Sequence, residues 1–433
     1  MRHSAIAVIL GIACIPCAEA QTPTFHREVE RILQARCQTC HRPGEAAPMS
    51  LLSYTDARPW AKSIKAAVLS RKMPPWFADR EVGHFRNDRT LPKEEIDTLV
   101  RWVDAGAPEG SVRDAPKPLE FVEGWGVGKP DAVYEMAQPF EVPANGVVDY
   151  QWVVIPLGLK EDRWIRAIEV RPGNRQVVHH IGAFLRMRGS RWLSDAPPGV
   201  AVPKAPGGSE AGMSNGLVGE YVPGLVGKTF PEGTAMLLPA GSDIVMQLHY
   251  TTTGKAAADR SRIGLYFAAE PPKERFLTLG VANTDYTIPP NASATRVLAK
   301  TTFGSDVRLL YLQPHMHLRG KSFEFKVAYP DGREEVLLRV PQYDFSWQLR
   351  YELAGEKLLP AGTTITATAV FDNSANNPRN PNPNVEVRNG EQSTDEMMAG
   401  IVHVAIPLDL DMRRLLRRAA AVYESAPKNA NAQ

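Results

Sequence analysis

The feature that most constrains this chain is a short motif near its start, Cys37-Gln38-Thr39-Cys40-His41, which fits the pattern C-x-x-C-H. In such a motif two thiols bond to the vinyl groups of a haem, and the histidine that follows ligates the iron. A structural zinc site is the rival interpretation, but it needs a second ligand pair, and no cysteine lies beyond this motif. The motif therefore predicts haem c bound covalently to Cys37 and Cys40, with His41 as one axial ligand.

The first twenty residues have the pattern of an export signal. Arg2 and His3 form a short polar start, residues 5–17 are apolar, and Ala18-Glu19-Ala20 offers the small residues that signal peptidase needs. A membrane anchor is the alternative, but about 20 apolar residues are needed to span a bilayer and this run is shorter. We expect a signal peptide over residues 1–20, cleaved after Ala20, and a periplasmic or secreted protein.

The charge of the chain is nearly balanced. It carries 50 basic and 48 acidic side chains, with no block of one sign, so we expect no nucleic-acid partner. No later segment is apolar over the length that spans a bilayer, so we expect no stable membrane insertion. A length of 433 residues is enough for two or three domains.

Helical patterns flank the C-x-x-C-H motif on both sides. Phe25, Val29, Ile32 and Leu33 recur at helical spacing before it. A second helix should begin at Pro92 and end before Gly106, with Ile96, Leu99, Val100 and Val103 on its buried face. This arrangement resembles the small c-type cytochromes, and the resemblance implies an all-α cytochrome c domain over residues 21–112.

The iron should have a methionine as its second axial ligand. We favour Met73, because Pro74-Pro75 ends the helix expected around residues 57–71 and leaves Met73 in an extended loop. Met49 and His84 are the alternatives. Met49 lies close to His41 in sequence for a segment that must cross the haem.

Beyond a linker over residues 113–125 the pattern changes to short strands. Runs such as 152–157, 164–170, 244–251 and 363–371 are apolar or alternating, with frequent glycine and proline between them. We expect two all-β jelly-roll or β-sandwich domains, over residues 126–272 and 273–413, with a polar tail over 414–433. The break is placed at the Pro271-Pro272 pair.

Five histidines of this β region have spacings that suggest metal ligation. His315 and His317 are two residues apart after a strand, so their imidazoles should share a face. The adjacent His179 and His180 would point to opposite faces of a regular strand. To share a metal they need a strand end, a bulge or different ring nitrogens. His249 by itself would be an ordinary structural histidine.

Four short segments, in this order, resemble the copper type II, ascorbate-dependent monooxygenases, the family of peptidylglycine α-hydroxylating and dopamine β-monooxygenases. They are Val178-His179-His180-Ile181, Gln247-Leu248-His249-Tyr250, His315-Met316-His317-Leu318-Arg319-Gly320-Lys321 and Ser393-Thr394-Asp395-Glu396-Met397. The resemblance covers residues 125–413. It implies two separated copper ions, one in each jelly-roll domain, facing a solvent-filled cleft.

The resemblance also implies how the ligands are divided between the two copper ions. An electron-relay copper would be bound by His179, His180 and His249. A second, O2-binding copper would be bound by His315, His317 and Met397, whose soft thioether favours Cu(I).

The chain departs from the peptide-amidating branch of that family. Gln313 and Ile401 stand where an arginine and a tyrosine would bind the substrate carboxylate, so a glycine-extended peptide is an unsuitable substrate. The cytochrome motif suggests that electrons arrive through haem, from an external donor, rather than from ascorbate. The chain is therefore expected to be an exported monooxygenase that hydroxylates a C–H bond of a small organic substrate with O2. The alternative is a non-catalytic electron-transfer or copper-binding protein, and a third interpretation makes the histidines structural.

Overall fold

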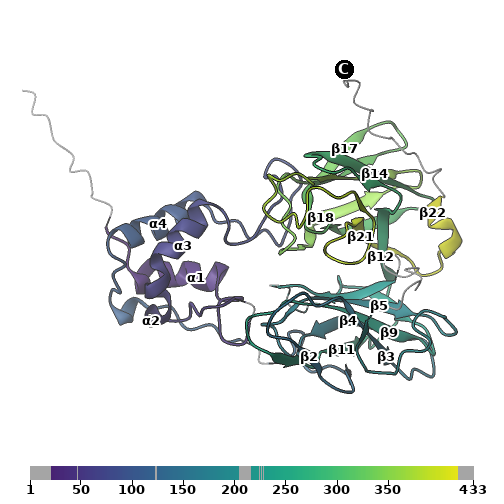
Figure 1. Cartoon of the computed structure of the whole chain (residues 1–433), viewed down its shortest axis with the longest axis horizontal. Helices are drawn as coiled ribbons and strands as arrows, with labels where there is room; N and C mark the ends of the chain where they lie inside the picture. The colour runs from purple at the N-terminus through teal and green to yellow at the C-terminus, as the bar shows by residue number, and fades with distance from the viewer. Residues whose placement is uncertain are drawn as a thin grey trace, which may run out of the picture.

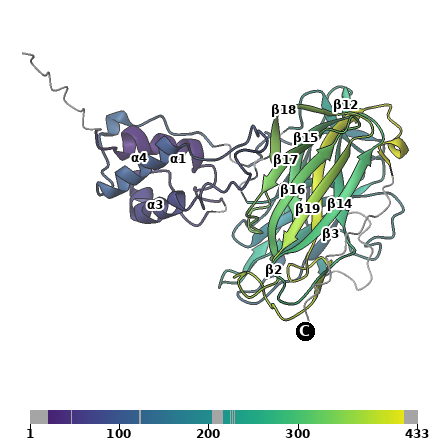
Figure 2. The same ribbon diagram turned by 90° about the horizontal axis from the view of Figure 1, so that it is seen from above.

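The computed structural model describes residues 21–45, 47–121, 124–203, 216–223, 225, 227 and 229–417. The expected signal peptide and residues 418–433 of the expected tail lie outside this description. A small helical region stands at one side of a larger body made of strands (Figure 1). The view from above shows the strands in extended layers and the helices beside them (Figure 2).

The helical region surrounds its own small apolar core. Its elements are η1 (Phe25–Val29), α1 (Glu30–Arg36), α2 (Tyr54–Ala57), η2 (Arg58–Trp60), α3 (Ala61–Leu69), α4 (Lys93–Asp104) and η3 (Val112–Asp114). Phe25, Leu33, Leu99 and Trp102 are fully buried in this core. On α4, Trp102 is fully buried. Val100 and Val103, which the sequence pattern placed on the buried face, are only partly buried. The helix expected around residues 57–71 is divided into the three elements α2, η2 and α3.

The strands of the first half of the β region are β1 (Ala132–Glu135), β2 (Phe140–Val142), β3 (Gln151–Pro156), β4 (Arg163–Arg171), β5 (Val178–Arg186), β6 (Val202–Pro203), β7 (Leu217–Tyr221), β8 (Thr234–Leu238), β9 (Asp243–Tyr250), β10 (Ala257–Asp259) and β11 (Arg262–Phe267). One sheet has the order β6-β3-β9-β5-β7. It packs against β4, β8 and β11 around an apolar core that includes Val153, Ile181 and Ile263. These two layers form the first β-sandwich.

The strands of the second half are β12 (Glu274–Asn283), β13 (Thr287–Ile288), β14 (Thr295–Phe303), β15 (Val307–His315), β16 (Gly320–Ala328), β17 (Glu334–Val340), β18 (Tyr351–Leu359), β19 (Thr364–Phe371), β20 (Val387–Arg388), β21 (Met398–Pro407) and β22 (Leu416–Arg417), with the turn η4 (Met412–Arg414). The sheet β17-β16-β19-β14-β22 packs on β12, β15 and β21 around Phe323, Phe325 and Val402. These layers form the second β-sandwich.

A single eight-stranded sheet runs through both sandwiches, in the order β1-β11-β4-β8-β12-β21-β15-β18. The two halves join where β8 and β12 pair in parallel, with Thr234 opposite Glu274. Leu310 and Tyr311 of β15 belong to the core of the first sandwich, although their strand lies in the second. The chain is therefore mostly β, in sandwich-like units, with a small helical region at its N-terminal side.

Two segments extend beyond the limits that the sequence suggested. The strap, residues 76–87, leaves the helical region and pairs with the edge of β18, where the backbone N–H of Arg86 donates to the carbonyl oxygen of Glu352 at 2.9 Å. Trp76 at its start is buried in the core of the second sandwich.

The expected start of the polar tail at residue 414 is wrong, because Leu415 is buried and Leu416 pairs with Phe303. Nowhere in the described ranges does a helix combine the length and the apolar character that crossing a membrane requires.

Candidate metal and haem sites

A β-bulge brings the adjacent histidines His179 and His180 to one site. In the pairing of β5 with β9, Val178 lies opposite Tyr250 and His180 opposite His249, with a register shift between them. His179 is the extra residue on β5. Because the bulge interrupts the alternation of side chains, the two imidazoles do not point to opposite faces. A bulge is one of the three arrangements that would allow these adjacent histidines to bind the same metal ion.

The imidazoles of His179, His180 and His249 converge on one point. One nitrogen from each ring can be chosen so that all three lie within 4.8 Å of one another. The Nδ1 atoms of His179 and His180 are 3.2 Å apart, a separation that suits a metal ion about 2.0–2.1 Å from each. Nδ1 of His249 is buried and has no hydrogen-bond partner among the described residues, while its Nε2 lies 3.4 Å from the Ser393 hydroxyl. This donor set fits a metal ion bound by three imidazoles.

Burial keeps these imidazoles neutral. It lowers the pKa of His179 to about 4 and that of His249 to about 3, and it lowers the pKa of His180 well below its usual value. Repulsion between the neighbouring histidines adds to the shift of the His180 pKa. A neutral imidazole has a free nitrogen lone pair, which is the form that binds a metal ion.

The second pair of histidines lies at the end of β15, in the second sandwich. The rings of His315 and His317 are 5.3 Å apart and nearly perpendicular. Nδ1 of His315 is 2.8 Å from Oε1 of Gln348, so this nitrogen donates and Nε2 is left as the ligand atom. The carboxylate of Glu396 accepts from the backbone N–H of His317 at 2.9 Å and holds the turn that carries both histidines.

One cavity of about 200 Å³ between the sandwiches contains members of both sets. We call it the histidine cavity. His180, His315, His317 and Met397 line it, and Met397 is half-buried there. Its neighbour Met398 is fully buried and packs in the core of the second sandwich. The structure thus brings all six expected copper ligands to one region.

Phe345 separates the two sets of histidines. Its ring stacks on that of His179 at 5.4 Å and lies 6.0 Å from His249 and 5.9 Å from His317. One aromatic side chain thus touches histidines of both sets, and the expected solvent-filled cleft between the two sites stays a prediction. Sequence reasoning missed Phe345 and Gln348, since both lie in the loop 341–350, which has no motif.

The haem motif lies on the turn that follows α1. The backbone N–H groups of Cys40 and His41 both donate to the carbonyl oxygen of Cys37, at 3.1 and 3.0 Å. The two thiols do not form a disulfide, and burial raises the pKa of the Cys37 thiol to about 12. Nδ1 of His41 is buried and has no hydrogen-bond partner in the described part of the chain. Two thiols and one imidazole on a single turn fit the attachment of a haem.

The three candidates for the second axial ligand lie in different places. Met49 packs against the helical core, and its backbone is in polar contact with the His41 imidazole. His84 is exposed on the strap that pairs with β18. Met73 lines a cavity of about 590 Å³ together with Leu91, which is buried in the helical core. The choice of Met73 as the second axial ligand stays a prediction.

Comparison with known proteins gives no relationship from which function could be transferred. No protein-family model matches the chain, and no curated protein matches its sequence. Among solved structures, the infectious bursal disease virus VP2 subviral particle is 10% identical over 66% of this chain and 74% of the viral chain, with a TM-score of 0.20. PNGF-II is 12% identical over 68% of this chain and 63% of its own, with a TM-score of 0.22. TM-scores this low support no argument about this chain.

Proposed function

We propose that the chain is a haem- and copper-dependent monooxygenase that hydroxylates a C–H bond of a small organic molecule. The observation that carries the proposal is the meeting of His179, His180 and His249 with a second set of expected ligands around one cavity. In the resembling family these two sets bind copper. When bound, copper would supply one-electron redox chemistry and an open position for O2.

The side chains around each set prepare it for a metal. Gln348 fixes the ring of His315 through Nδ1, which directs Nε2 toward the cavity. Tyr150 packs edge-on against His249 at 4.8 Å and Phe345 covers the ring of His179. These aromatic side chains exclude water and hold the imidazoles in place.

The rest of the histidine cavity suggests what kind of substrate fits. Phe184, Leu217 and Ile401 give it apolar walls. The buried polar atoms on its wall that have no hydrogen-bond partner among the described residues include Oε1 of Glu220, Oε1 of Gln313 and Nε2 of Gln348. Buried polar atoms of this kind need a partner.

The charge of the cavity wall favours a neutral substrate. Gln313 donates through Nε2 to Glu220 at 2.7 Å, so its Oε1 is an acceptor, and Arg350 offsets the charge of Glu220. We therefore propose a small, largely apolar substrate with a hydrogen-bond donor, such as a hydroxyl or primary amide. Alcohols and amides should accelerate turnover, and carboxylates of equal size should not.

Copper content tests the proposed sites first. Haem-loaded protein should contain two coppers per haem by elemental analysis, and His249→Ala should contain about one, because a site of three imidazoles loses one ligand. His84→Ala is the matched control and should keep two, since His84 is exposed and belongs to neither set of ligands. Reconstituted protein that binds no copper would show that the histidines are structural.

Haem reoxidation then separates an enzyme from a simple electron carrier. Protein reduced with dithionite and mixed with O2 should reoxidise its haem much faster with copper than without, because a haem with two protein ligands has no open iron position. Equal rates with and without copper would contradict the proposal. Fast reoxidation that yields no hydroxylated product with any small organic molecule would favour the non-catalytic alternative.

A further inference from the structure

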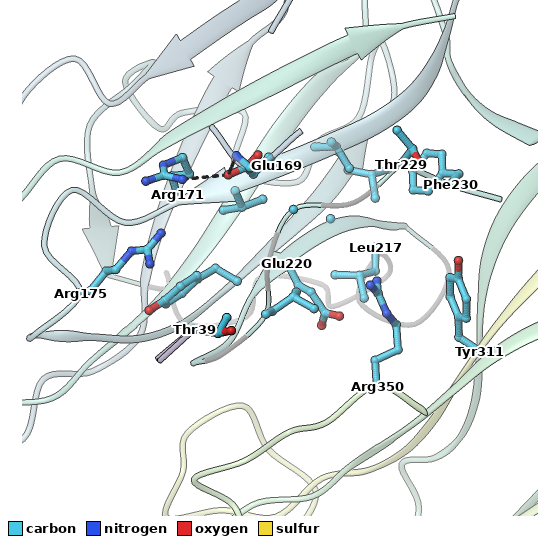
Figure 3. A pocket seen from close by; sticks show the side chains of 18 of the residues that line it. Thr39, Glu169, Arg171, Arg175, Leu217, Glu220, Thr229, Phe230, Tyr311 and Arg350 are labelled. Atoms are coloured by element: carbon cyan, nitrogen blue, oxygen red, sulfur yellow. Dashed lines mark hydrogen bonds and ion pairs between the residues drawn. The ribbon is translucent and has the colours of Figure 1, made fainter. Parts of the chain in front are cut away.

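A second cavity, of about 220 Å³, lies beside the C-x-x-C-H turn. We call it the haem-side cavity. Thr39 and Arg42 of the haem motif and its following loop line it on one side, and strands of the first sandwich line it on the other. Figure 3 shows Thr39 and Arg175 at one side of this cavity, with Glu220 and Leu217 near its centre. The haem motif thus faces the first sandwich.

Strand β7 is the wall between the haem-side cavity and the histidine cavity. Leu217, Glu220 and Tyr221 of this strand line both cavities. β7 is also the edge strand of the sheet β6-β3-β9-β5-β7, next to the strand that carries His179 and His180. One strand therefore separates the expected haem attachment site from the expected relay-copper site.

An ion pair holds the haem-side loop against this wall. Arg175, in the turn before β5, pairs with Glu45, which follows the haem motif by four residues. The Arg175 guanidinium also lies over the Tyr221 ring, 5.7 Å from its centre. Cys40 is close enough to both side chains to affect their pKa values. Tyr221 therefore lines the same cavity as Thr39, the residue before the second cysteine of the motif.

The register of β7 gives a short path from Tyr221 to the histidines. Tyr221 is paired with Ile181 on β5, and Ile181 is bonded to His180 by one peptide bond. The hydroxyl of Tyr221 is buried and has no hydrogen-bond partner within the described ranges. Burial raises the pKa of this hydroxyl, so it stays protonated. Its ring contributes packing, and none of the described residues accepts a hydrogen bond from its hydroxyl.

We propose that strand β7, through Tyr221, is the electron bridge from the haem to the relay-copper ligands, and that the Glu45–Arg175 pair positions the haem-side loop on it. The inference rests on the proposed function. With haem bound at Cys37, Cys40 and His41 and copper bound by His179, His180 and His249, one electron would pass from ferrous haem, which would become ferric, to Cu(II), which would become Cu(I). No bond is made or broken and no proton moves.

The rate of haem oxidation by copper without O2 tests the bridge. In haem- and copper-loaded protein, the haem is reduced by a flash and its reoxidation is followed anaerobically. Tyr221→Leu and Arg175→Gln should slow this step at least tenfold with copper content unchanged. Tyr221→Phe should keep the rate, because the ring and not the hydroxyl makes the contact. Lys326→Ala, which removes an ion pair in the second sandwich, is the control and should have no effect.

The packing of the haem-side loop against strand β7 can be measured without copper. In copper-free, haem-loaded protein, Glu45→Arg or Arg175→Glu should make the segment 109–121 more sensitive to limited proteolysis and enlarge the particle in solution scattering. The double variant with exchanged charges should restore both values. Protein that binds no copper would overturn the proposed function, and this assay would still decide whether the pair holds the loop. Normal copper binding with unchanged electron-transfer rates in every variant would overturn the bridge alone.

Discussion

Phe345 contacts the imidazoles of both histidine sets, and its side chain is only 6% exposed. Replacing a buried phenylalanine by alanine removes apolar contacts and leaves a cavity, at a cost of about 3–5 kcal/mol. We expect Phe345→Ala to lower the free energy of unfolding of copper-free protein by about 3 kcal/mol in urea denaturation. Leu358→Ala, at an exposed position, should change it by less than about 0.5 kcal/mol. A similar small effect for Phe345→Ala would mean that this side chain does not pack between the histidines.

Glu220 should make stability depend on pH. Burial raises the pKa of its carboxyl above the usual value of 4.5. The folded protein then holds this proton at pH values where the unfolded chain has lost it, so stability from this group falls as pH rises from about 4.5 toward the folded pKa.

Comparing the stability of the wild type with that of Glu220→Gln at each pH isolates the contribution of this carboxyl. The amide has the same shape as the carboxyl and does not titrate. From pH 4.5 upward, wild-type copper-free protein should lose stability relative to the variant by up to about 1.4 kcal/mol per pH unit, until the folded pKa is passed. Parallel stability curves for the two proteins would contradict the burial of this carboxyl.

Short irregular elements, rather than regular strands, position the expected ligands. The bulge in β5 presents His179 and His180 together, and the turn after β15 presents His317 beside His315. Met73 follows the end of α3 in the same way, in the segment that leads to the strap. These ligands lie where the backbone leaves its repeating geometry, whereas His249 lies within the regular strand β9.

Substitution of the three candidate axial ligands tests whether Met73, in the loop after α3, is the second ligand of the haem iron. Met73→Ala should remove the charge-transfer band that a thioether gives with ferric haem, because Met73 is the expected thioether ligand. Met49→Ala and His84→Ala are the matched controls and should keep the band, since the Met49 backbone contacts the His41 imidazole itself and His84 is exposed on the strap. Loss of the band in Met49→Ala, with the band kept in Met73→Ala, would reverse the assignment.

The two sandwiches should unfold as one unit, because β8 and β12 join them into one sheet and Leu310 lies in the core of the first although its strand belongs to the second. Calorimetry of copper-free protein should give one transition for the β region, with equal van't Hoff and calorimetric enthalpies. Two resolved β transitions would mean that the shared sheet does not make them cooperative.

Core substitutions in each sandwich sharpen this test. Val153→Ala removes buried volume from the first sandwich and Phe323→Ala from the second. If the two sandwiches unfold as one cooperative unit, both variants should lower the midpoint temperature of the same unfolding transition. In two independent units each variant would lower only one transition and leave the other where it was.

Local patterns in the sequence determined a large share of this description. The spacing of Phe25, Val29 and Leu33 predicted the helix before the haem motif, although its first turn is π-helical. Alternating and apolar runs predicted strands at residues 152–157 and 244–251, within a residue of β3 and β9. These features could be predicted because side-chain period and turn residues act over a few positions of the chain. The identities of haem and copper stay predictions.

Only the tertiary structure decided which distant residues meet. Phe345, Gln348 and Glu220 carry no motif, yet they line or separate the expected ligand sets. Tyr221 gains its place opposite Ile181 from the pairing of β7 with β5, and its place in the haem-side cavity brings it under the Arg175 guanidinium. Such contacts depend on strand register and on the packing of whole sheets. Both follow from the total free energy of the folded chain and not from the preferences of any short segment.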